Sequence, residues 1–328
     1  MLINPVSPAT RREFLKSAAA AGAALGATAL GAERLAAAAV TGVQGASETL
    51  VKQLYGTLTE QQKSVMAFPF GHPLQSKVDA NWYITKARVG SGFSADQRQL
   101  IFDIFRGLHN PEFVDEVMRH VKEDAGGLED SSIAIFGEPG AGGFEFVLTG
   151  RHCTVRCDGD SVEGAAFGGP IFYGHASGSF NEPADHAGNV YWFQAKRANE
   201  VFQALDGKQR AAALLGDPRP EQKSDTVNLK TSKAELDGLP AADMSRDQRG
   251  LVEKVLADLL LPFREADRDE AMRHIKANGG VESLSMAFYK NLDIGGDGVW
   301  DVWQLESPKM VWYFRGSPHV RTWVNIRA

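Results

Sequence analysis

The chain contains 328 residues, of which 43% are hydrophobic and 23% are charged, and its formal net charge at pH 7 is −6. This composition is typical of a globular protein and excludes collagen, low-complexity disorder and a polytopic membrane protein. The negative charge argues against binding to nucleic acids, whose phosphate backbone attracts basic proteins. Two cysteines are too few for a disulfide scaffold or a four-thiolate zinc site.

The N-terminus has the pattern of an export signal. Residues 10–16 read Thr-Arg-Arg-Glu-Phe-Leu-Lys and are followed by small residues over 18–30. This resembles a twin-arginine signal, and the alanines at 36–39 suit signal peptidase. The charges at 33–34 interrupt the apolar run before it could span a bilayer. We therefore expect residues 1–39 to be a signal peptide recognised by the twin-arginine export machinery. The mature chain would be periplasmic or extracellular, without a stable membrane span.

The pattern from about Ser47 to Glu123 predicts helices, and further helices are expected over 189–204, 245–260 and 265–277. Four helix starts carry the pairing of a capping box, in which the first and last residues satisfy each other's backbone donors. These pairs are Thr59 with Gln62, Ser94 with Gln97, Asp206 with Gln209, and Ser245 with Gln248. Because the intervals between them are unequal, we interpret them as local capping and expect no repeat architecture.

The period changes to two in the middle of the chain. Residues 144–149 and 153–157 alternate as half-buried strands, which predicts a hairpin or meander over 144–167. A C-terminal meander follows. Its four expected strands cover 283–289, 299–306, 310–315 and 319–326.

Residues 216–243 contain three prolines and many charges, and we expect a surface linker or excursion there. Residues 40–328 are therefore predicted to form a single α+β domain. Its mixed or mainly antiparallel sheet would be built from central and C-terminal strands, with N-terminal and intervening helices packed on it.

The eight histidines fall into different settings. His120 and His274 lie in charged helical stretches, where surface positions are expected. In contrast, His152, His175, His186 and His319 lie on the strands and glycine-rich loops of the β-rich part.

Alternation places His152 on one strand face with Thr154 and Arg156, and His319 on one face with Arg321 and Trp323. If the two strands are neighbours, two imidazoles and several guanidinium groups converge. An equally compatible interpretation is that these side chains merely solvate an antiparallel sheet.

Such a face suggests two kinds of chemistry. His152, His319 and His175, with the carboxylate of Glu145, are candidate ligands for one transition metal ion, zinc, iron or copper. Alternatively, His152 and His319 act as acid/base groups. Arg151 and the arginines on the two strands would bind a small anionic substrate.

Three other features have weaker patterns. Residues 167–175, rich in glycine, predict either a binding loop or a strand with ordinary turns. Cys153 and Cys157 would lie about 13 Å apart on one strand, too far for a disulfide, and are interpreted as small core residues. Residues 293–298 resemble a calcium loop but lack its terminal glutamate, so a simple turn is expected.

The chain resembles the bacterial family known as domain of unknown function 3500. The resemblance covers most of the mature chain and rests on four segments: Thr149–Val155, Phe167–His175, His186–Trp192 and Pro318–Arg321. Members of that family tend to carry Gly-His-His where this chain has Gly150-Arg151-His152, and His-x-His where it has His319-Val320-Arg321. Paired imidazoles imply a metal, and arginine in their place favours an anion pocket.

The leading hypothesis is an exported enzyme, either metal-dependent or acid/base, that acts on a small anionic substrate. His152 and His319 would be its catalytic residues, and Arg151, Arg156, Arg321 and Trp323 would bind the substrate. A non-catalytic cell-envelope protein that binds a ligand through the same Arg/His/Trp pocket is the alternative. A structural envelope protein is a third possibility.

Overall fold

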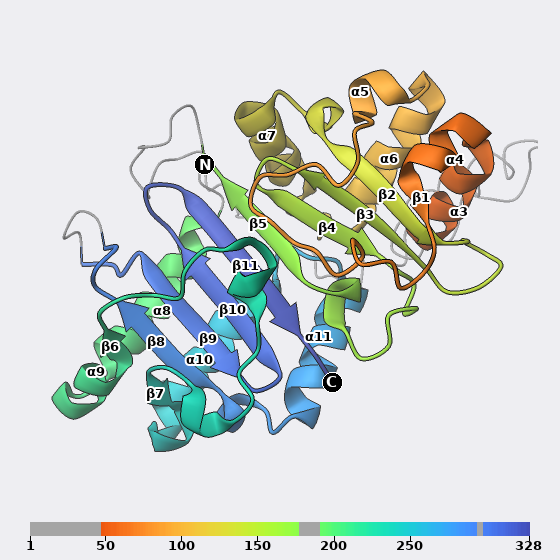
Figure 1. The fold of residues 1–328 in the computed structure, drawn as a ribbon. Coiled ribbons are helices and arrows are strands. Elements are labelled where there is room, and N and C mark those ends of the chain that lie inside the picture. Colours follow the sequence, from red (N-terminus) through yellow and green to blue (C-terminus); the bar gives the residue numbers. More distant parts are fainter. Residues whose placement is uncertain (1–46, 177–190, 294–297) are drawn as a thin grey trace, which may run out of the picture. The chain divides into compact units, whose positions relative to one another are not determined.

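The computed structural model describes residues 47–176, 191–293 and 298–328, which belong to one compact unit from Val43 to Ala328. The predicted signal peptide lies outside the described residues, as do His186 and most of the turn at 293–298. The predicted α+β class is confirmed: helices accompany an eleven-stranded, mainly antiparallel mixed sheet (Figure 1).

The first half of the unit runs from helices to strands, as predicted. Its helices are α3 (Ser47–Thr57), α4 (Glu60–Met66), α5 (Val89–Gly92), α6 (Ala95–Gly107) and α7 (Val114–Ala125). Its strands are β1 (Ala67–Phe68), β2 (Ser132–Gly137), β3 (Phe144–Gly150), β4 (Cys153–Cys157) and β5 (Ile171–His175).

The second half runs through the same kinds of element. Its helices are α8 (Trp192–Ala204), α9 (Gly207–Ala213), α10 (Arg246–Leu260) and α11 (Glu265–Ala277). Its strands are β6 (Leu214–Leu215), β7 (Leu239–Pro240), β8 (Ser285–Tyr289), β9 (Val302–Ser307), β10 (Met310–Arg315) and β11 (Val320–Ile326). The predicted helices and C-terminal strands are confirmed.

The strands follow one another in chain order from each edge of the sheet towards its centre. The order runs β1-β2-β3-β4-β5-β11-β10-β9-β8-β6, with β7 pairing β8 beside this path. The edge strands β1 and β6 are parallel to β2 and β8, whereas every other pairing is antiparallel. The sheet therefore has a pseudo-twofold arrangement centred on the β5–β11 pair.

The same symmetry relates contacts on the helical side. The loop after α6 and the loop after α10 exchange backbone hydrogen bonds: Asn110 N–H donates to the Pro262 carbonyl, and Arg264 N–H donates to the Leu108 carbonyl. His109 and Phe263 form an isolated antiparallel bridge between the same loops. The expectation of no repeat was therefore wrong: the unit contains two similar halves. The N-caps of the two capping boxes are 35 residues apart in the first half (94 − 59) and 39 in the second (245 − 206), so the repeat was hidden by comparing all successive intervals instead of the two halves.

All four predicted capping boxes are present. The boxes also pair with each other within each half. The Gln62 amide nitrogen lies 2.9 Å from Gln97 Oε1, and the Gln209 amide nitrogen lies 3.0 Å from Gln248 Oε1. These contacts join the starts of α4 and α6, and of α9 and α10.

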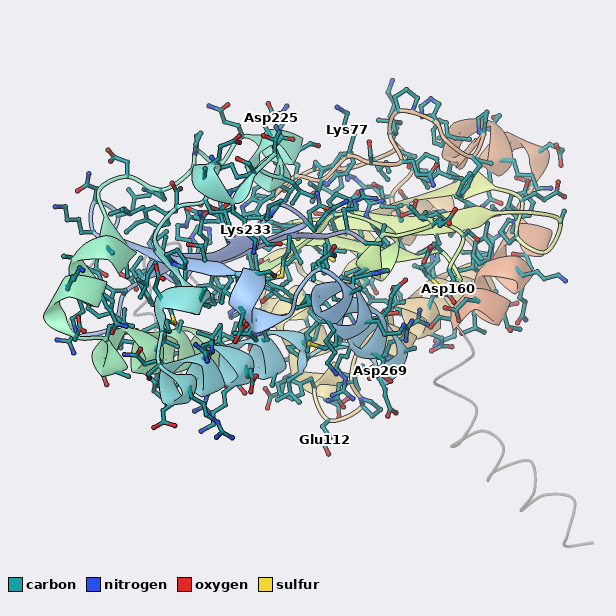
Figure 2. The ribbon with its side chains drawn as sticks, turned by 90° about the horizontal axis from the view of Figure 1, so that it is seen from below. Lys77, Glu112, Asp160, Asp225, Lys233 and Asp269 are labelled. Atoms are coloured by element: carbon teal, nitrogen blue, oxygen red, sulfur yellow. The ribbon has the colours of Figure 1, made fainter. Side chains whose placement is uncertain are left out.

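The sheet has a helix layer on one face and two long connections on the other. We call these segments, residues 69–88 and 216–243, the covering connections. Figure 2 shows the segments of Lys77 and Asp225 on one side of the sheet and α11, with Asp269, on the other. The segment predicted as a linker, 216–243, is part of this cover, since Val227 and Leu239 are buried and β7 pairs with β8. The prediction missed this role because prolines and charges mark a surface path whether or not it packs on a sheet. The face of β4 that carries its polar residues is consequently buried.

Candidate functional site

His152 and His319 lie side by side at one end of the central strand pair. His152 is in the two-residue turn between β3 and β4, and His319 directly precedes β11. Their ring centroids are 4.9 Å apart, and the residues are only 5% and 6% exposed. Two residues separated by 167 positions thus share one buried location.

The strands that hold these two residues are not direct neighbours, because β5 lies between β4 and β11. Gly174 of β5 makes the approach possible: a Cβ there would lie 3.4 Å from the Cβ of His152 and 2.2 Å from the Val320 carbonyl oxygen. His152 has φ of 50°, a left-handed conformation that is uncommon for residues with a side chain. Its N–H donates to the Ala80 carbonyl at 2.9 Å, which fixes the turn against the covering connection.

Asp124, in the last turn of α7, holds the His152 ring. One carboxylate oxygen contacts His152 Nδ1, and the other lies 3.0 Å from Arg151 Nε. The Asp124 side chain is only 2% exposed. An ionised carboxylate only accepts hydrogen bonds, so Nδ1 of His152 carries the proton and Nε2 is the nitrogen suited to proton transfer. A buried carboxylate that orients an imidazole is the arrangement found in acid/base catalysis.

The neighbouring imidazole is held by a guanidinium instead. Arg321 Nε donates to His319 Nε2 at 3.3 Å, and because a guanidinium has no acceptor, Nε2 of His319 is unprotonated in this contact. Glu221, from the covering connection, binds Arg321 at 2.9 Å and Arg315 at 3.1 Å. Burial lowers the pKa of Arg315, with Glu221 opposing and Arg321 adding to the effect. The two histidines therefore have opposite surroundings: His152 contacts a carboxylate and His319 contacts a guanidinium.

A second pair of histidines packs on the helical side of the same strand end. The rings of His120 and His175 are 3.6 Å apart and nearly parallel, at 11°. Glu123 Oε2 lies 3.5 Å from His175 Nε2. The prediction that His120 is a surface residue was wrong, since it is 2% exposed. One end of α7 thus supplies His120, Glu123 and Asp124 to two histidine pairs, His120 with His175 and His152 with His319, which together we call the histidine cluster.

The sequence analysis missed the residues that α7 and the covering connection contribute. Spacing offered one indication: His120, Glu123 and Asp124 are three and four residues apart, so they share a helix face. Nothing in the sequence marked Glu221, because it lies in a charged, proline-rich segment that looks solvated.

Arg156 and Glu145 lie away from the histidine cluster. They form an ion pair of 2.7 Å, with neither side chain exposed, near the end of β3 and β4 opposite the His152 turn. Arg156 also donates to the carbonyls of Pro170 at 2.6 Å and Lys77 at 2.7 Å. This arginine therefore cross-links strands and cover. Along β3, five residues separate Glu145 from Gly150, about 16 Å at 3.3 Å per residue.

Trp323 is also separated from any accessible surface. It is 1% exposed and packs edge-on against Phe172, with ring centroids 4.7 Å apart. The indole belongs to the core beneath the covering connections. It is not positioned to stack on a ligand that binds at the surface.

The four residues predicted as metal ligands do not converge. His152 and His319 are together, His175 faces Glu123 across the strand, and Glu145 is remote. Within the described part of the chain, no group of three or more His, Cys, Asp or Glu side chains is arranged to hold a metal ion. These residues do not fit a single ion.

Cys153 and Cys157 are buried free thiols. Burial raises the pKa of Cys153 to about 12 and that of Cys157 well above its usual value. Both side chains therefore stay protonated and are poor nucleophiles. His274, predicted to be exposed, is half-buried on α11 and lies 3.7 Å from Glu270.

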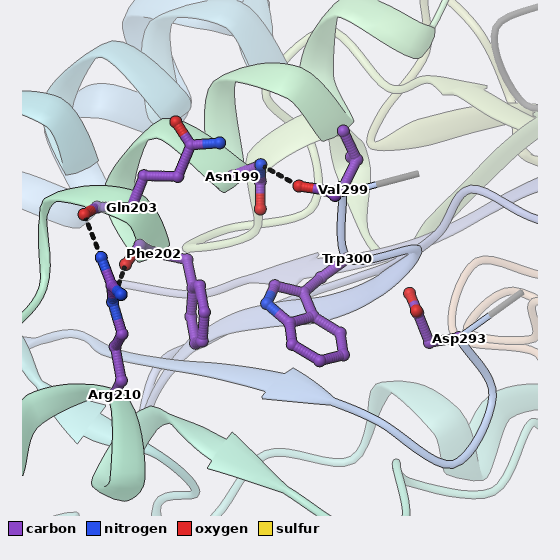
Figure 3. A pocket seen from close by; sticks show the side chains of 8 residues that line it. Asn199, Phe202, Gln203, Arg210, Asp293, Val299 and Trp300 are labelled. Atoms are coloured by element: carbon purple, nitrogen blue, oxygen red, sulfur yellow. Dashed lines mark hydrogen bonds between the residues drawn. The ribbon is translucent and has the colours of Figure 1, made fainter. Parts of the chain in front are cut away.

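Several surface pockets lie elsewhere. Figure 3 shows one of about 350 Å³ where Phe202 and Trp300 meet edge-on and Asn199 donates to the Gly298 carbonyl. Another, of about 420 Å³, lies between the two covering connections and is lined by Lys77, Trp82 and Asp225, among others.

Comparison with known proteins gives one match. The family model described as "Protein of unknown function (DUF3500)" matches residues 41–321, which confirms the predicted family. No curated protein and no solved structure matches the chain.

Proposed function

Since the chain belongs to the DUF3500 family, whose description assigns no activity, we propose from its own geometry that it is an exported acid/base enzyme acting on a small anionic substrate. The observation that supports this most strongly is the pair of buried imidazoles, 4.9 Å apart, one held by Asp124 and the other by Arg321.

His152 and His319 would transfer protons. Asp124 fixes the His152 tautomer and would stabilise the imidazolium formed when Nε2 takes a proton. His319, whose Nε2 faces a guanidinium, would act as the neutral partner. Paired titratable groups in opposite surroundings are the usual way in which one site provides both an acid and a base.

Arg151 and Arg321 would bind the anion. Their side chains are 30% and 28% exposed, whereas the rings between them are buried, so the guanidinium groups lie nearer to solvent than the imidazoles. Each is already held by a carboxylate, Asp124 or Glu221, which orients it. A planar guanidinium can then present its remaining donors to a carboxylate or phosphate.

The alternative of a non-catalytic binding protein uses the same arginines. Trp323, which was expected to stack on the ligand in this alternative, is buried in the core and does not support it. Nothing in the described structure favours it over the acid/base proposal, and a substrate screen separates the two.

The test is to incubate the purified protein with a mixture of small acidic metabolites and to follow each compound by mass spectrometry. We expect at least one anion to be consumed by the wild type, and its consumption to fall about 100-fold or more in His152→Gln and Asp124→Asn. The matched control is His274→Gln, which removes another imidazole beside a carboxylate, and it should retain full activity. Anion binding without turnover would favour the binding protein. Turnover that survives His152→Gln would contradict the proposed site.

A further inference from the structure

A second site lies at the opposite end of the β5–β11 pair. Because these strands are antiparallel, the start of β5 adjoins the end of β11. A pocket of about 300 Å³ opens there. Its lining includes Glu145, Gly168, Gly169, Arg327 and Phe70, so it collects residues from both halves of the unit.

Only one of the two carboxylate oxygens of the buried Glu145 has a hydrogen-bond partner. Its Oε1 accepts from Arg156 at 2.7 Å, whereas Oε2 is buried without a hydrogen-bond partner. Burial raises the pKa of Glu145, and Arg156 and, to a lesser extent, a side-chain contact from Gln75 oppose this effect. By distance and angle, however, Oε2 has no hydrogen-bond partner. A buried polar atom without a partner is costly. In this pocket, Oε2 is suited to accept from a ligand.

Arg327 supplies the net charge of the pocket, since Glu145 and Arg156 neutralise each other. Its Nε donates to Asn325 Oδ1 at 3.1 Å, which fixes the guanidinium plane and leaves the terminal nitrogens for other partners. Burial lowers the pKa of Arg327 and the charge of Arg156 lowers it further, while Glu145 raises it, so these charges act on one another at close range. An anionic group beside Arg327 would offset the electrostatic repulsion between the two guanidinium groups.

The glycine-rich segment predicted as a possible binding loop forms one wall. Gly168 and Gly169 have φ of 72° and 140°, conformations that favour glycine, and a Cβ on Gly168 would lie 3.0 Å from Asp158 Cγ. Phe70, 43% exposed, also lines the pocket. The pocket thus combines glycine backbone, an apolar ring, the acceptor Oε2 of Glu145 and the cation of Arg327. The polar side chains of His72, Gln75 and Ser76 also line it.

We propose that this pocket binds a small carboxylic acid with a hydroxyl or ammonium group beside its carboxylate. Arg327 holds the carboxylate, and Oε2 of Glu145 accepts from the adjacent donor. The site is separate from the histidine cluster and does not depend on the acid/base activity proposed for it.

The test is a titration of the ¹⁵N-glycine-labelled protein with glycolate, glycine and acetate, monitored at the amide signals of Gly168 and Gly169. Glycolate and glycine should give saturable shifts, and acetate, which lacks the second donor, should bind about tenfold more weakly or less. Arg327→Gln should weaken all three by about tenfold or more. Arg246→Gln, an exposed arginine outside the pocket, should change nothing.

Glu145→Gln should abolish the preference for glycolate over acetate, because it replaces the acceptor with an amide donor while keeping a partner for Arg156. If that variant does not fold, the binding measurements on Arg327→Gln test the proposal instead. We expect this variant to fold because the Arg327 side chain is only partly buried. The proposal is overturned if none of the three probes gives a saturable shift, if Arg327→Gln binds like the wild type, or if acetate binds as tightly as glycolate.

Discussion

Asp124 connects the end of α7 to two functional side chains, because its two oxygens face Arg151 and His152. A carboxylate buried without such partners would be strongly destabilising. The same contacts that stabilise the charge also select the His152 tautomer. The contacts that stabilise the buried carboxylate are thus the same ones on which the proposed proton transfer depends.

A buried histidine at the boundary of the two halves should make stability depend on pH. Burial lowers the pKa of His109 to about 4, from 6.5. Between these values the unfolded chain binds a proton that the folded chain does not, so stability contributed by the neutral ring is present above pH 6.5 and is lost as the pH falls towards 4. His109→Gln removes this titration. In urea unfolding at pH 7 and pH 4, the wild type should lose about 3 kcal/mol more than the variant. Equal losses would show that His109 is accessible when folded.

At the scale of residues, sequence patterns proposed His152, His319, Arg151 and Arg321 as candidates, because strand alternation and glycine-rich context are local properties. They did not identify His120 or Asp124. Whether a helical residue is buried depends on which face of the helix meets the sheet, and a charged helix gives little indication of it. The pairing of distant side chains is a tertiary property.

Helices and strands were largely predictable because their determinants are short-range. The capping boxes are an example: each needs only a hydroxyl or carboxylate and a glutamine three residues later. The sequence could not predict that the two capping boxes within each half contact each other through their glutamines. Gln97 also donates to the Thr57 carbonyl at 2.9 Å and is 6% exposed, so it joins α3, α4 and α6.

Loss of this junction should be measurable. Gln97→Ala removes half of a capping box and leaves the Thr57 carbonyl unpaired, so the free energy of unfolding should fall by about 2 kcal/mol. Gln99→Ala, an exposed glutamine two residues along the same helix, should stay within about 0.5 kcal/mol of the wild type. Chemical denaturation of both variants provides the comparison. Equal effects would mean that the junction adds nothing to ordinary helix propensity.

In the whole molecule, the two halves share topology but not chemistry. The turn Arg151-His152 in the first half corresponds to Pro308-Lys309 in the second, since two residues join β3 to β4 and β9 to β10. The position of His152 therefore carries no imidazole in the second half, which contributes His319 from the start of β11 instead. The pseudo-twofold arrangement brings these two non-equivalent positions together.

Export remains a proposal that rests on the N-terminal sequence. In the described part of the chain, no helix is both long and apolar enough to cross a bilayer. If Arg11 and Arg12 are read by the twin-arginine machinery, the double variant Arg11→Lys, Arg12→Lys should accumulate in the cytoplasm. Lys16→Gln, a charge change outside the arginine pair, should be exported normally. Cell fractionation and immunoblotting measure both, and equal periplasmic amounts of wild type and double variant would rule out this route.

The measurement closest to the central proposal is the imidazole ¹⁵N spectrum of the protein labelled at histidine. It should show His152 protonated at Nδ1, with that proton shifted far downfield by the Asp124 carboxylate, and His319 unprotonated at Nε2. Asp124→Asn should remove the downfield proton and leave the His274 signals unchanged. A wild-type spectrum with His152 protonated only at Nε2, or one that Asp124→Asn does not alter, would contradict the assignment of this cluster as a proton-transfer site.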